Sequence, residues 1–211
     1  MDANFWHRKW ETNDIAFHER DANPLLVKFF PQLSLAAGRR IFLPLCGKTR
    51  DIAWLLSAGY RVAGAELSEL AVRQLFTELG ITPTLTVLGS LIHFKAPSID
   101  MYVGDIFQLS AATLGPVDAV YDRAALVALP EAMRRDYTSH LQAMTCQAPQ
   151  LLICFEYDQA LLSGPPFSVN AAEVGRHYAA SFTLKPLASL TVQGGLKGKC
   201  EAKEQVWLLT P

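Results

Sequence analysis

A glycine and a glutamate at a fixed spacing have the chemistry needed to hold a nucleoside. Gly47 follows a short apolar run at 41–43, and Glu66 follows a second run at 61–65. An acidic residue about 20 positions after such a glycine is where a carboxylate binds the hydroxyls of a ribose. The spacing therefore predicts a nucleoside site. A solvated carboxylate after an ordinary turn is the alternative.

The loop around Gly47 indicates which kind of nucleoside derivative fits. It has one glycine and so lacks the three-glycine fingerprint of dinucleotide sites. Pro44 has no amide proton, and Leu45 and Cys46 carry side chains where a pyrophosphate needs close backbone amides. A ligand with a ribose but no phosphate fits better, and S-adenosylmethionine is such a ligand. A nicotinamide-dependent oxidoreductase is the alternative from another enzyme class.

The elements that must position these residues are a strand, a helix and a second strand. Residues 41–43 and 61–65 are short and apolar, as expected of strands buried on both faces of a parallel sheet. Residues 51–57 carry apolar side chains at helical spacing, and Gly59 lies where a helix commonly ends. Such a unit places the loop, the helix N-terminus and Glu66 around one crevice.

Strands and helices alternate along the rest of the chain, which predicts a largely parallel α/β sheet with helices on both faces. Ser68 and Gly80 are of the residue types that cap a helix at its two ends. The other expected strands form an inserted hairpin, three buried strands and a closing antiparallel hairpin: 84–88 with 91–94, 99–103, 117–121, 151–155, and 182–190 with 205–209.

The first 36 residues differ from the rest of the chain. Trp6 and Trp10 are one helical turn apart, and Pro24 is suited to begin a second helix. We expect residues 1–36 to form a helical lid on a single domain that spans residues 1–211.

Composition excludes several classes of protein. The chain has 211 residues, is half apolar, is 18% charged and has a net charge of −1, without runs of like charge. We therefore expect no nucleic-acid partner, no membrane partner and a monomer. Its four cysteines form no C-x-x-C pair, and its start has no secretory pattern, so reduced thiols in the cytoplasm and no metal site are expected.

Several motifs in order along the chain resemble one known family. They are FWHRKWETNDIAFHE at 5–19, PLCGK at 44–48, VAGAELSELAV at 62–72, DIF at 105–107, DRAALVAL at 122–129 and VWLLTP at 206–211. Together they resemble the thiopurine S-methyltransferases, especially the bacterial branch, over essentially the whole chain. The resemblance implies the class I S-adenosylmethionine-dependent methyltransferase fold, a Rossmann-like, mostly parallel sheet of seven strands with the last strand reversed.

The same resemblance implies an activity. It is the transfer of a methyl group from S-adenosylmethionine to the sulfur of aromatic or heterocyclic thiols such as 6-mercaptopurine, which leaves S-adenosylhomocysteine. Some bacterial relatives are associated with methylation of selenium or tellurium species, so tellurite resistance is an alternative role. A binding module that has lost its chemistry is a third hypothesis.

The resemblance also implies which residues hold the cofactor. Glu66 is expected to bind the ribose, and an indole face is suited to attract the sulfonium cation. The residues implied are Trp10, Leu45, Cys46, Gly47, Glu66, Leu67, Asp105, Ile106 and Arg123. The loop residues are expected to act through backbone atoms. The alternatives are a capping role for Asp105 and a packing role for Trp10.

Two residues are expected on the acceptor side. Phe17 is suited to stack on a flat heterocycle, with a core position under a loop as the alternative. Arg123 is expected to be catalytic and to bind the cofactor carboxylate, an anionic acceptor or both, with an ion pair to Asp122 or a glutamate as the alternative. No general base is assigned, because heterocyclic thiols are acidic enough to be largely anionic near neutral pH.

Overall fold

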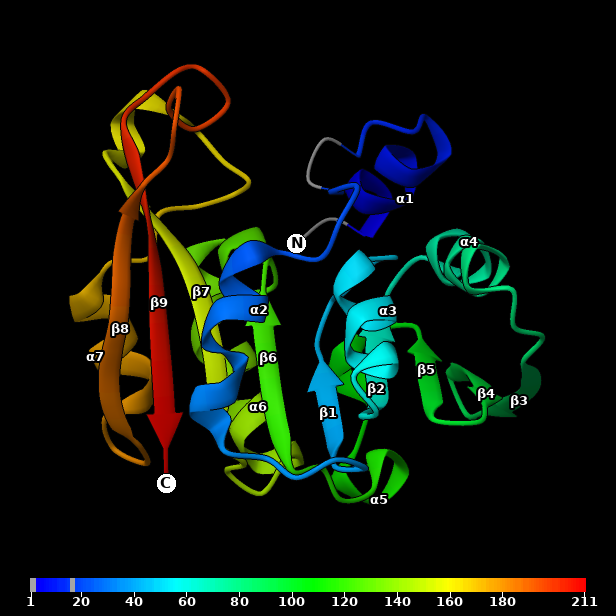
Figure 1. The fold of residues 1–211 in the computed structure, drawn as a ribbon. Coiled ribbons are helices and arrows are strands. Elements are labelled where there is room, and N and C mark those ends of the chain that lie inside the picture. The colour runs from blue at the N-terminus through cyan, green and yellow to red at the C-terminus, as the bar shows by residue number, and fades with distance from the viewer. Residues whose placement is uncertain (1–2, 16–17) are drawn as a thin grey trace.

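A computed structural model describes residues 3–15 and 18–211, and within them one nine-stranded sheet is flanked by helices (Figure 1). Across the sheet the strands lie in the order β3-β4-β5-β2-β1-β6-β7-β9-β8. Their bounds are β1 Arg40–Leu43, β2 Arg61–Glu66, β3 Thr84–Leu88, β4 Leu91–Ala96, β5 Ile99–Val103, β6 Ala119–Arg123, β7 Gln150–Tyr157, β8 Thr183–Thr191 and β9 Ala202–Thr210. The five central strands β5, β2, β1, β6 and β7 are parallel.

The expected fold class is confirmed, but the expected count of seven strands is wrong. The part of the chain that the structure describes has nine, because the inserted hairpin β3–β4 joins the sheet instead of standing apart from it. β4 pairs antiparallel with β5 over five residue pairs, from Ile92↔Val103 to Ala96↔Ile99. The remaining seven strands have the expected arrangement, with β9 antiparallel to both β7 and β8.

Helices cover both faces of this sheet and enclose two cores. On one face, α2 (Pro24–Phe29), α3 (Arg50–Ser57) and α4 (Glu69–Leu79) pack over one apolar cluster. On the other, α5 (Ala111–Leu114), α6 (Glu131–Met144) and α7 (Ala171–Tyr178) enclose the second. Short 3-10 helices lie at Phe30–Leu33, Ile106–Gln108, Leu126–Ala128 and Gln159–Leu161. No helix of the described residues is long and apolar enough to cross a membrane.

Local capping explains where the helices near the site begin and end. The side chain of Ser68 accepts from the amide of Ala71 at the start of α4, and Gly80 ends that helix with φ +67°, both as expected. Thr49 caps α3 by accepting from the Asp51 amide. These caps fix the first turn of each helix next to the end of a parallel strand.

The first helix, α1 (Ala3–Glu11), lies apart from the two helical layers. It sits beyond the carboxyl ends of β1 and β2 (Figure 1). The carboxyl ends of parallel strands are where open α/β sheets bind their ligands, so α1 covers the edge of the sheet expected to be functional.

Candidate functional site

The first part of the site is a buried carboxylate at the end of β2. Glu66 is 6% exposed, and its Oε2 accepts from the Gly47 amide at 2.8 Å while its Oε1 accepts from the Ser68 amide at 2.9 Å. The two residues singled out by their spacing are therefore in direct contact. Glu66 joins the loop after β1 to the start of α4.

The pKa of Glu66 reflects this environment. Burial raises its pKa, and the amides of Ser68, Gly47 and Leu67, with the nearby His7, act in the opposite direction. Each oxygen of an ionised carboxylate has about two acceptor positions, and the Gly47 and Ser68 amides occupy one on each oxygen. Glu66 therefore keeps the capacity to accept further hydrogen bonds, as two ribose hydroxyls would donate.

The loop residue Gly47 is in contact with α1. Gly47 has φ +55°, and a Cβ there would lie 2.8 Å from Cζ2 of Trp10. Trp10 is 4% exposed, so its indole packs against the loop backbone at the residue whose amide contacts Glu66. The residue at position 47 must be small because α1 approaches the loop so closely.

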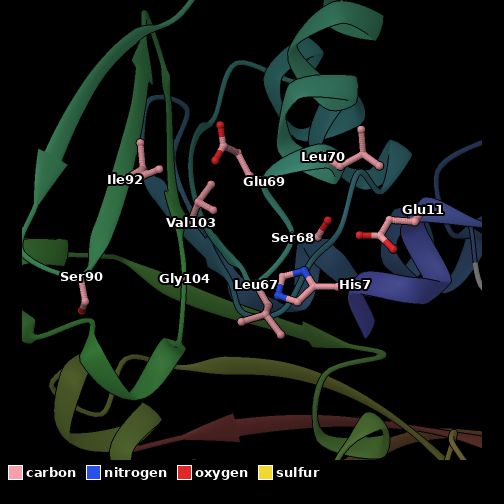
Figure 2. A pocket seen from close by; sticks show the side chains of 10 residues that line it. All are labelled: His7, Glu11, Leu67, Ser68, Glu69, Leu70, Ser90, Ile92, Val103 and Gly104. Carbon is pink, nitrogen blue, oxygen red and sulfur yellow. The ribbon is translucent and has the colours of Figure 1, made fainter. Parts of the chain in front are cut away.

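A cavity of about 360 Å³ opens beside these residues. Its wall comes from α1, from the β2–α4 junction and from the ends of β4 and β5: His7, Glu11, Leu67, Ser68, Glu69, Leu70, Ser90, Ile92, Val103 and Gly104 (Figure 2). Figure 2 shows His7 reaching from α1 toward Leu67 and Ser68. The volume is in the usual range for a small-molecule site.

Of the expected cofactor residues, Leu67 lines this cavity directly. Glu66 lies next to it in the chain, and its carbonyl accepts from the Gly104 amide of the opposite wall at 2.9 Å. The cavity therefore lies between the ends of β2 and β5. The adenine of an adenosine whose ribose is hydrogen-bonded to Glu66 would extend into it.

Asp105 and Ile106 follow β5 and differ in setting. Asp105 is exposed, and its Oδ1 accepts from the Phe107 amide at 3.0 Å, which is the capping role held open as its alternative. Ile106 is 5% exposed, and its carbonyl lies 2.9 Å from Nε2 of His140. Neither side chain is in the wall of the cavity.

Leu45 and Cys46 form the turn between β1 and Gly47. Leu45 has φ +45°, and the Cys46 amide donates to the Ala65 carbonyl at 3.2 Å, which holds the turn on β2. Burial, with a further contribution from Glu66, raises the pKa of the Cys46 thiol. Cys46 is therefore kept protonated and is not a nucleophile.

Arg123 ends β6 on the other side of β1, away from the cavity. Its side chain is 14% exposed and forms an ion pair with Glu19 from the segment before α2. Burial lowers the pKa of Arg123, but Tyr121, Glu19 and Asp51 raise it more, so the guanidinium stays charged. The expected alternative of an ion pair to a glutamate is thus present.

The neighbouring Asp122 points to the opposite face and does not pair with Arg123. It is fully buried and accepts from the Tyr137 hydroxyl at 2.7 Å and from the Leu126 amide at 3.1 Å. Burial raises its pKa from 3.8 to about 6. Asp122 therefore fixes the turn that follows Arg123 by accepting from the Leu126 amide.

Phe17 lies outside the described residues, so its expected place beside the acceptor stays a prediction. His18 next to it is half-buried, and burial and the nearby Lys48 lower its pKa. The two glutamates near Arg123 are Glu19 and Glu204, and the sequence did not indicate which glutamates these would be. Nothing in their sequence context marks them, because their relation to Arg123 depends on how the segment before α2 and β9 pack.

The residues at this edge fit S-adenosylmethionine. The free acceptor positions of Glu66 suit a ribose, and the cavity beside Leu67 suits an adenine. In the turn at 44–47, the Cys46 amide donates to the Ala65 carbonyl and the Gly47 amide to Glu66, so neither amide is free for a pyrophosphate. Among the described residues, no group of three or more His, Cys, Asp or Glu side chains is placed to hold a metal ion.

The sequence matches known proteins over its whole length. Residues 1–210 match the thiopurine S-methyltransferase family. A thiopurine S-methyltransferase of Xanthobacter autotrophicus is 59% identical over 210 residues, which cover 99% of both chains. One from Gluconobacter oxydans is 46% identical, over 99% of this chain and 95% of its own.

Solved structures share the fold at low sequence identity. A Burkholderia thailandensis 1,6-didemethyltoxoflavin-N1-methyltransferase, with S-adenosylhomocysteine bound, has a TM-score of 0.67 at 16% identity, covering 99% of this chain and 87% of its own. The glycopeptide N-methyltransferase MtfA complexed with S-adenosylmethionine has a TM-score of 0.57 at 14% identity, covering 92% and 96%. These similarities establish the methyltransferase fold.

Proposed function

Because the chain belongs to the thiopurine S-methyltransferase family, we propose that it methylates the sulfur of aromatic or heterocyclic thiols, such as the thiopurine 6-mercaptopurine. Family membership makes it an S-adenosylmethionine-dependent methyltransferase. The observation that carries the proposal is that two charged groups lie on opposite sides of β1. One is the buried carboxylate of Glu66, which can still accept hydrogen bonds from a ribose, and the other is the guanidinium of Arg123.

The cofactor half of the site comprises β1, β2 and β5. Glu66 holds the ribose, and the turn formed by Leu45, Cys46 and Gly47 meets the ribose and methionine parts through its backbone. Leu67 lies against the adenine, and the Asp105–Ile106 backbone frames its far side. The cavity between Leu67 and Gly104 supports this arrangement.

Trp10 bounds the cofactor half from the lid. Its indole already packs on Gly47, and an aromatic face attracts a sulfonium cation by about 0.5–2 kcal/mol. The N-terminal segment 1–36 acts as the lid that brings this indole to the cofactor.

The acceptor half lies toward β6. Arg123 orients an anionic or polarised sulfur, and Phe17 stacks on the acceptor ring. A guanidinium has five N–H donors, and the ion pair with Glu19 leaves donors free for an acceptor. The enzyme is proposed to act as a cytoplasmic monomer on small molecules, and its modest size and even distribution of charge support a monomer.

The reaction is an in-line displacement. S-adenosylmethionine supplies the methyl group, already activated on a sulfonium. The protein holds the acceptor sulfur in line with that methyl group, excludes water by means of the lid and fixes the acceptor charge with Arg123. Positioning of this kind contributes about 7–11 kcal/mol in favourable cases.

A metalloid acceptor is the second candidate. The same guanidinium that orients a thiolate also binds selenium or tellurium oxyanions, because both are anions that suit an arginine fork. This role would connect the enzyme with tellurite resistance.

A panel of acceptors separates the two candidates. The panel compares kcat/KM for 6-mercaptopurine, thiophenol, selenite and tellurite with S-adenosylmethionine saturating. The proposal expects turnover of both thiols. Arg123→Ala should lower kcat/KM for them while leaving the free energy of unfolding largely unchanged. Turnover of the metalloid oxyanions without turnover of either thiol would establish the second candidate instead.

A further inference from the structure

Glu204 on β9 is a half-buried carboxylate that has no role in the proposed function described above. Within residues 3–15 and 18–211, its side chain forms no hydrogen bond and no ion pair. Its neighbours on the same strand differ: Gln205 donates to Glu156, and Val206 is buried in the core. A carboxylate that is partly withdrawn from water without a partner is costly, which suggests a role.

The register of the sheet places Glu204 relative to Arg123. Arg123 pairs with Ile153 of β7, and Ile153 pairs with Val206 of β9, so these three lie in one row across the sheet. Glu204 is two residues from Val206 and opposite Phe155, hence on the same face and one step closer to the carboxyl end of β7. Two strand spacings place β9 about 10 Å from β6, and the two-residue offset adds about 7 Å along the strand, a separation that two long side chains can span.

The charged groups that face Glu204 are few. They are Arg123 from β6 and Glu19 from the segment before α2, while its cross-strand partners Phe155 and Leu190 are uncharged. Burial raises the pKa of Glu204, Arg123 lowers it and Glu19 raises it, with a net increase. A carboxylate with a raised pKa is a better proton acceptor near neutral pH than an ordinary one.

The acceptor class proposed above presents a matching pair of groups. A heterocyclic thiol that is not ionised carries its proton on the ring nitrogen beside the carbon–sulfur bond. It therefore offers a sulfur acceptor and an N–H donor side by side. A guanidinium and a carboxylate on one face of the sheet, at the acceptor half, are complementary to that pair.

We infer that Glu204 is a catalytic residue for heterocyclic acceptors, accepting the ring N–H proton while Arg123 faces the acceptor sulfur. This inference rests on the proposed function and adds a general base and a preference to it. The preference is for acceptors with an N–H next to the carbon that bears sulfur.

The step balances without any other reactant. The acceptor sulfur forms a bond to the methyl carbon, and the methyl–sulfonium bond breaks with its electron pair left on the departing sulfur. The ring nitrogen loses its proton to the Glu204 carboxylate and keeps the electron pair. One positive and one negative charge disappear, and Glu204 later releases its proton to water.

The test compares Glu204→Gln with the wild-type protein across pH. With 6-mercaptopurine near pH 6, where the acceptor is mostly neutral, kcat/KM should fall about 10²-fold in the variant. Near pH 9 the acceptor is ionised in solution, so the deficit should shrink to less than about 3-fold. Thiophenol, which has no ring nitrogen, should show a deficit of less than about 3-fold at pH 9 as well.

Controls separate a chemical role from a structural one. Glu201→Gln changes an exposed glutamate three positions earlier and should leave kcat/KM unchanged. Calorimetric binding of S-adenosylhomocysteine should be the same for Glu204→Gln as for the wild type, because the cofactor half lies across β1. If Glu204→Gln does not fold, Glu204→Asp keeps the carboxylate and should retain the wild-type pH dependence at reduced kcat/KM.

Two results would overturn the inference. One is a deficit of equal size at pH 6 and pH 9, and the other is no deficit with 6-mercaptopurine at either pH. If the wild-type protein itself methylates neither 6-mercaptopurine nor thiophenol, the proposed function fails, and this inference fails with it.

Discussion

Glu66 illustrates how one side chain can organise a loop and still remain available to a ligand. Its two oxygens accept from the amides of Gly47 and Ser68, so the loop after β1 and the cap of α4 are held at a fixed distance. The carboxylate is aligned before any ligand arrives, and preorganisation of this kind reduces the entropy lost on binding.

Replacing this carboxylate tests its part in cofactor binding. Glu66→Gln should raise the Kd for S-adenosylhomocysteine about 10- to 100-fold, because a hydrogen bond to a charged group contributes about 1.5–3 kcal/mol. Isothermal titration calorimetry measures this directly. Glu131→Gln, at an exposed position on α6, is the control, and an unchanged Kd in Glu66→Gln would rule out the ribose contact.

Asp122 makes a prediction about stability and pH. Its pKa in the folded chain is about 6, against an ordinary value of 3.8, so the folded state binds more protons than the unfolded state between those values. The free energy of unfolding should therefore decrease by about 3 kcal/mol as the pH rises from about 4 to 6. The contribution is fully present below pH 3.8 and is lost as the pH passes 6.

Asp122→Asn removes this titration. Urea unfolding of both proteins at pH 4, 5, 6 and 7 should show the wild type gaining stability relative to the variant as the pH falls. Parallel curves for the two proteins would mean that Asp122 titrates normally.

At the scale of residues, the sequence predicts those whose partners are close in the chain or at a known spacing. Gly47 and Glu66 were predictable for that reason, and the structure joins them directly. Glu19 and Glu204 were not, because only tertiary packing brings Glu19 into its ion pair with Arg123 and Glu204 within electrostatic range of it. The capping role of Asp105 was visible as an alternative, since it depends on the next two residues alone.

At the scale of elements, the contact between α1 and the loop after β1 matters most. Trp10 packs on Gly47 so closely that a Cβ at position 47 would lie 2.8 Å from the indole. The position of α1 and the conformation of the loop after β1 are therefore coupled through this contact. A substitution in α1 at Trp10 should therefore alter the effect of a substitution in the loop at Gly47.

Gly47→Ala tests this coupling. The added methyl group clashes with Trp10 and the backbone at φ +55° is unfavourable for alanine, so the protein should lose about 1–3 kcal/mol of stability in urea unfolding. In a Trp10→Ala background the clash is gone and only the backbone strain is left, so the same substitution should cost less. An equal cost in both backgrounds would show that the two residues are not coupled.

Element boundaries were predictable where caps and glycines mark them, as at Ser68 and Gly80. The four-residue helix α5 was missed because it is too short to show a period. The strand count was wrong because nothing local in residues 84–96 says whether a hairpin stands alone or extends a sheet. That outcome depends on backbone pairing between β4 and β5, which is a long-range choice.

At the scale of the whole molecule, β1 divides the carboxyl edge of the sheet into two halves. Figure 1 shows β2 and β5 on one side of β1 and β6, β7 and β9 on the other. Glu66 ends β2 and the cavity lies on the first side, whereas Arg123 ends β6 and Glu204 belongs to β9 on the second. In the proposed arrangement, a methyl group carried by a cofactor in the first half would face an acceptor in the second. The fold similarity to N-methyltransferases shows that this layout alone does not fix which atom is methylated.

The most direct test of the central claim is where the methyl group goes. The protein is incubated with S-adenosylmethionine labelled with carbon-13 in its methyl group and with 6-mercaptopurine, and the product is observed by NMR. The account predicts a single labelled S-methyl product, formed in equal amount to S-adenosylhomocysteine. Label on a ring nitrogen, or S-adenosylmethionine left unchanged by a protein that binds S-adenosylhomocysteine, would contradict it.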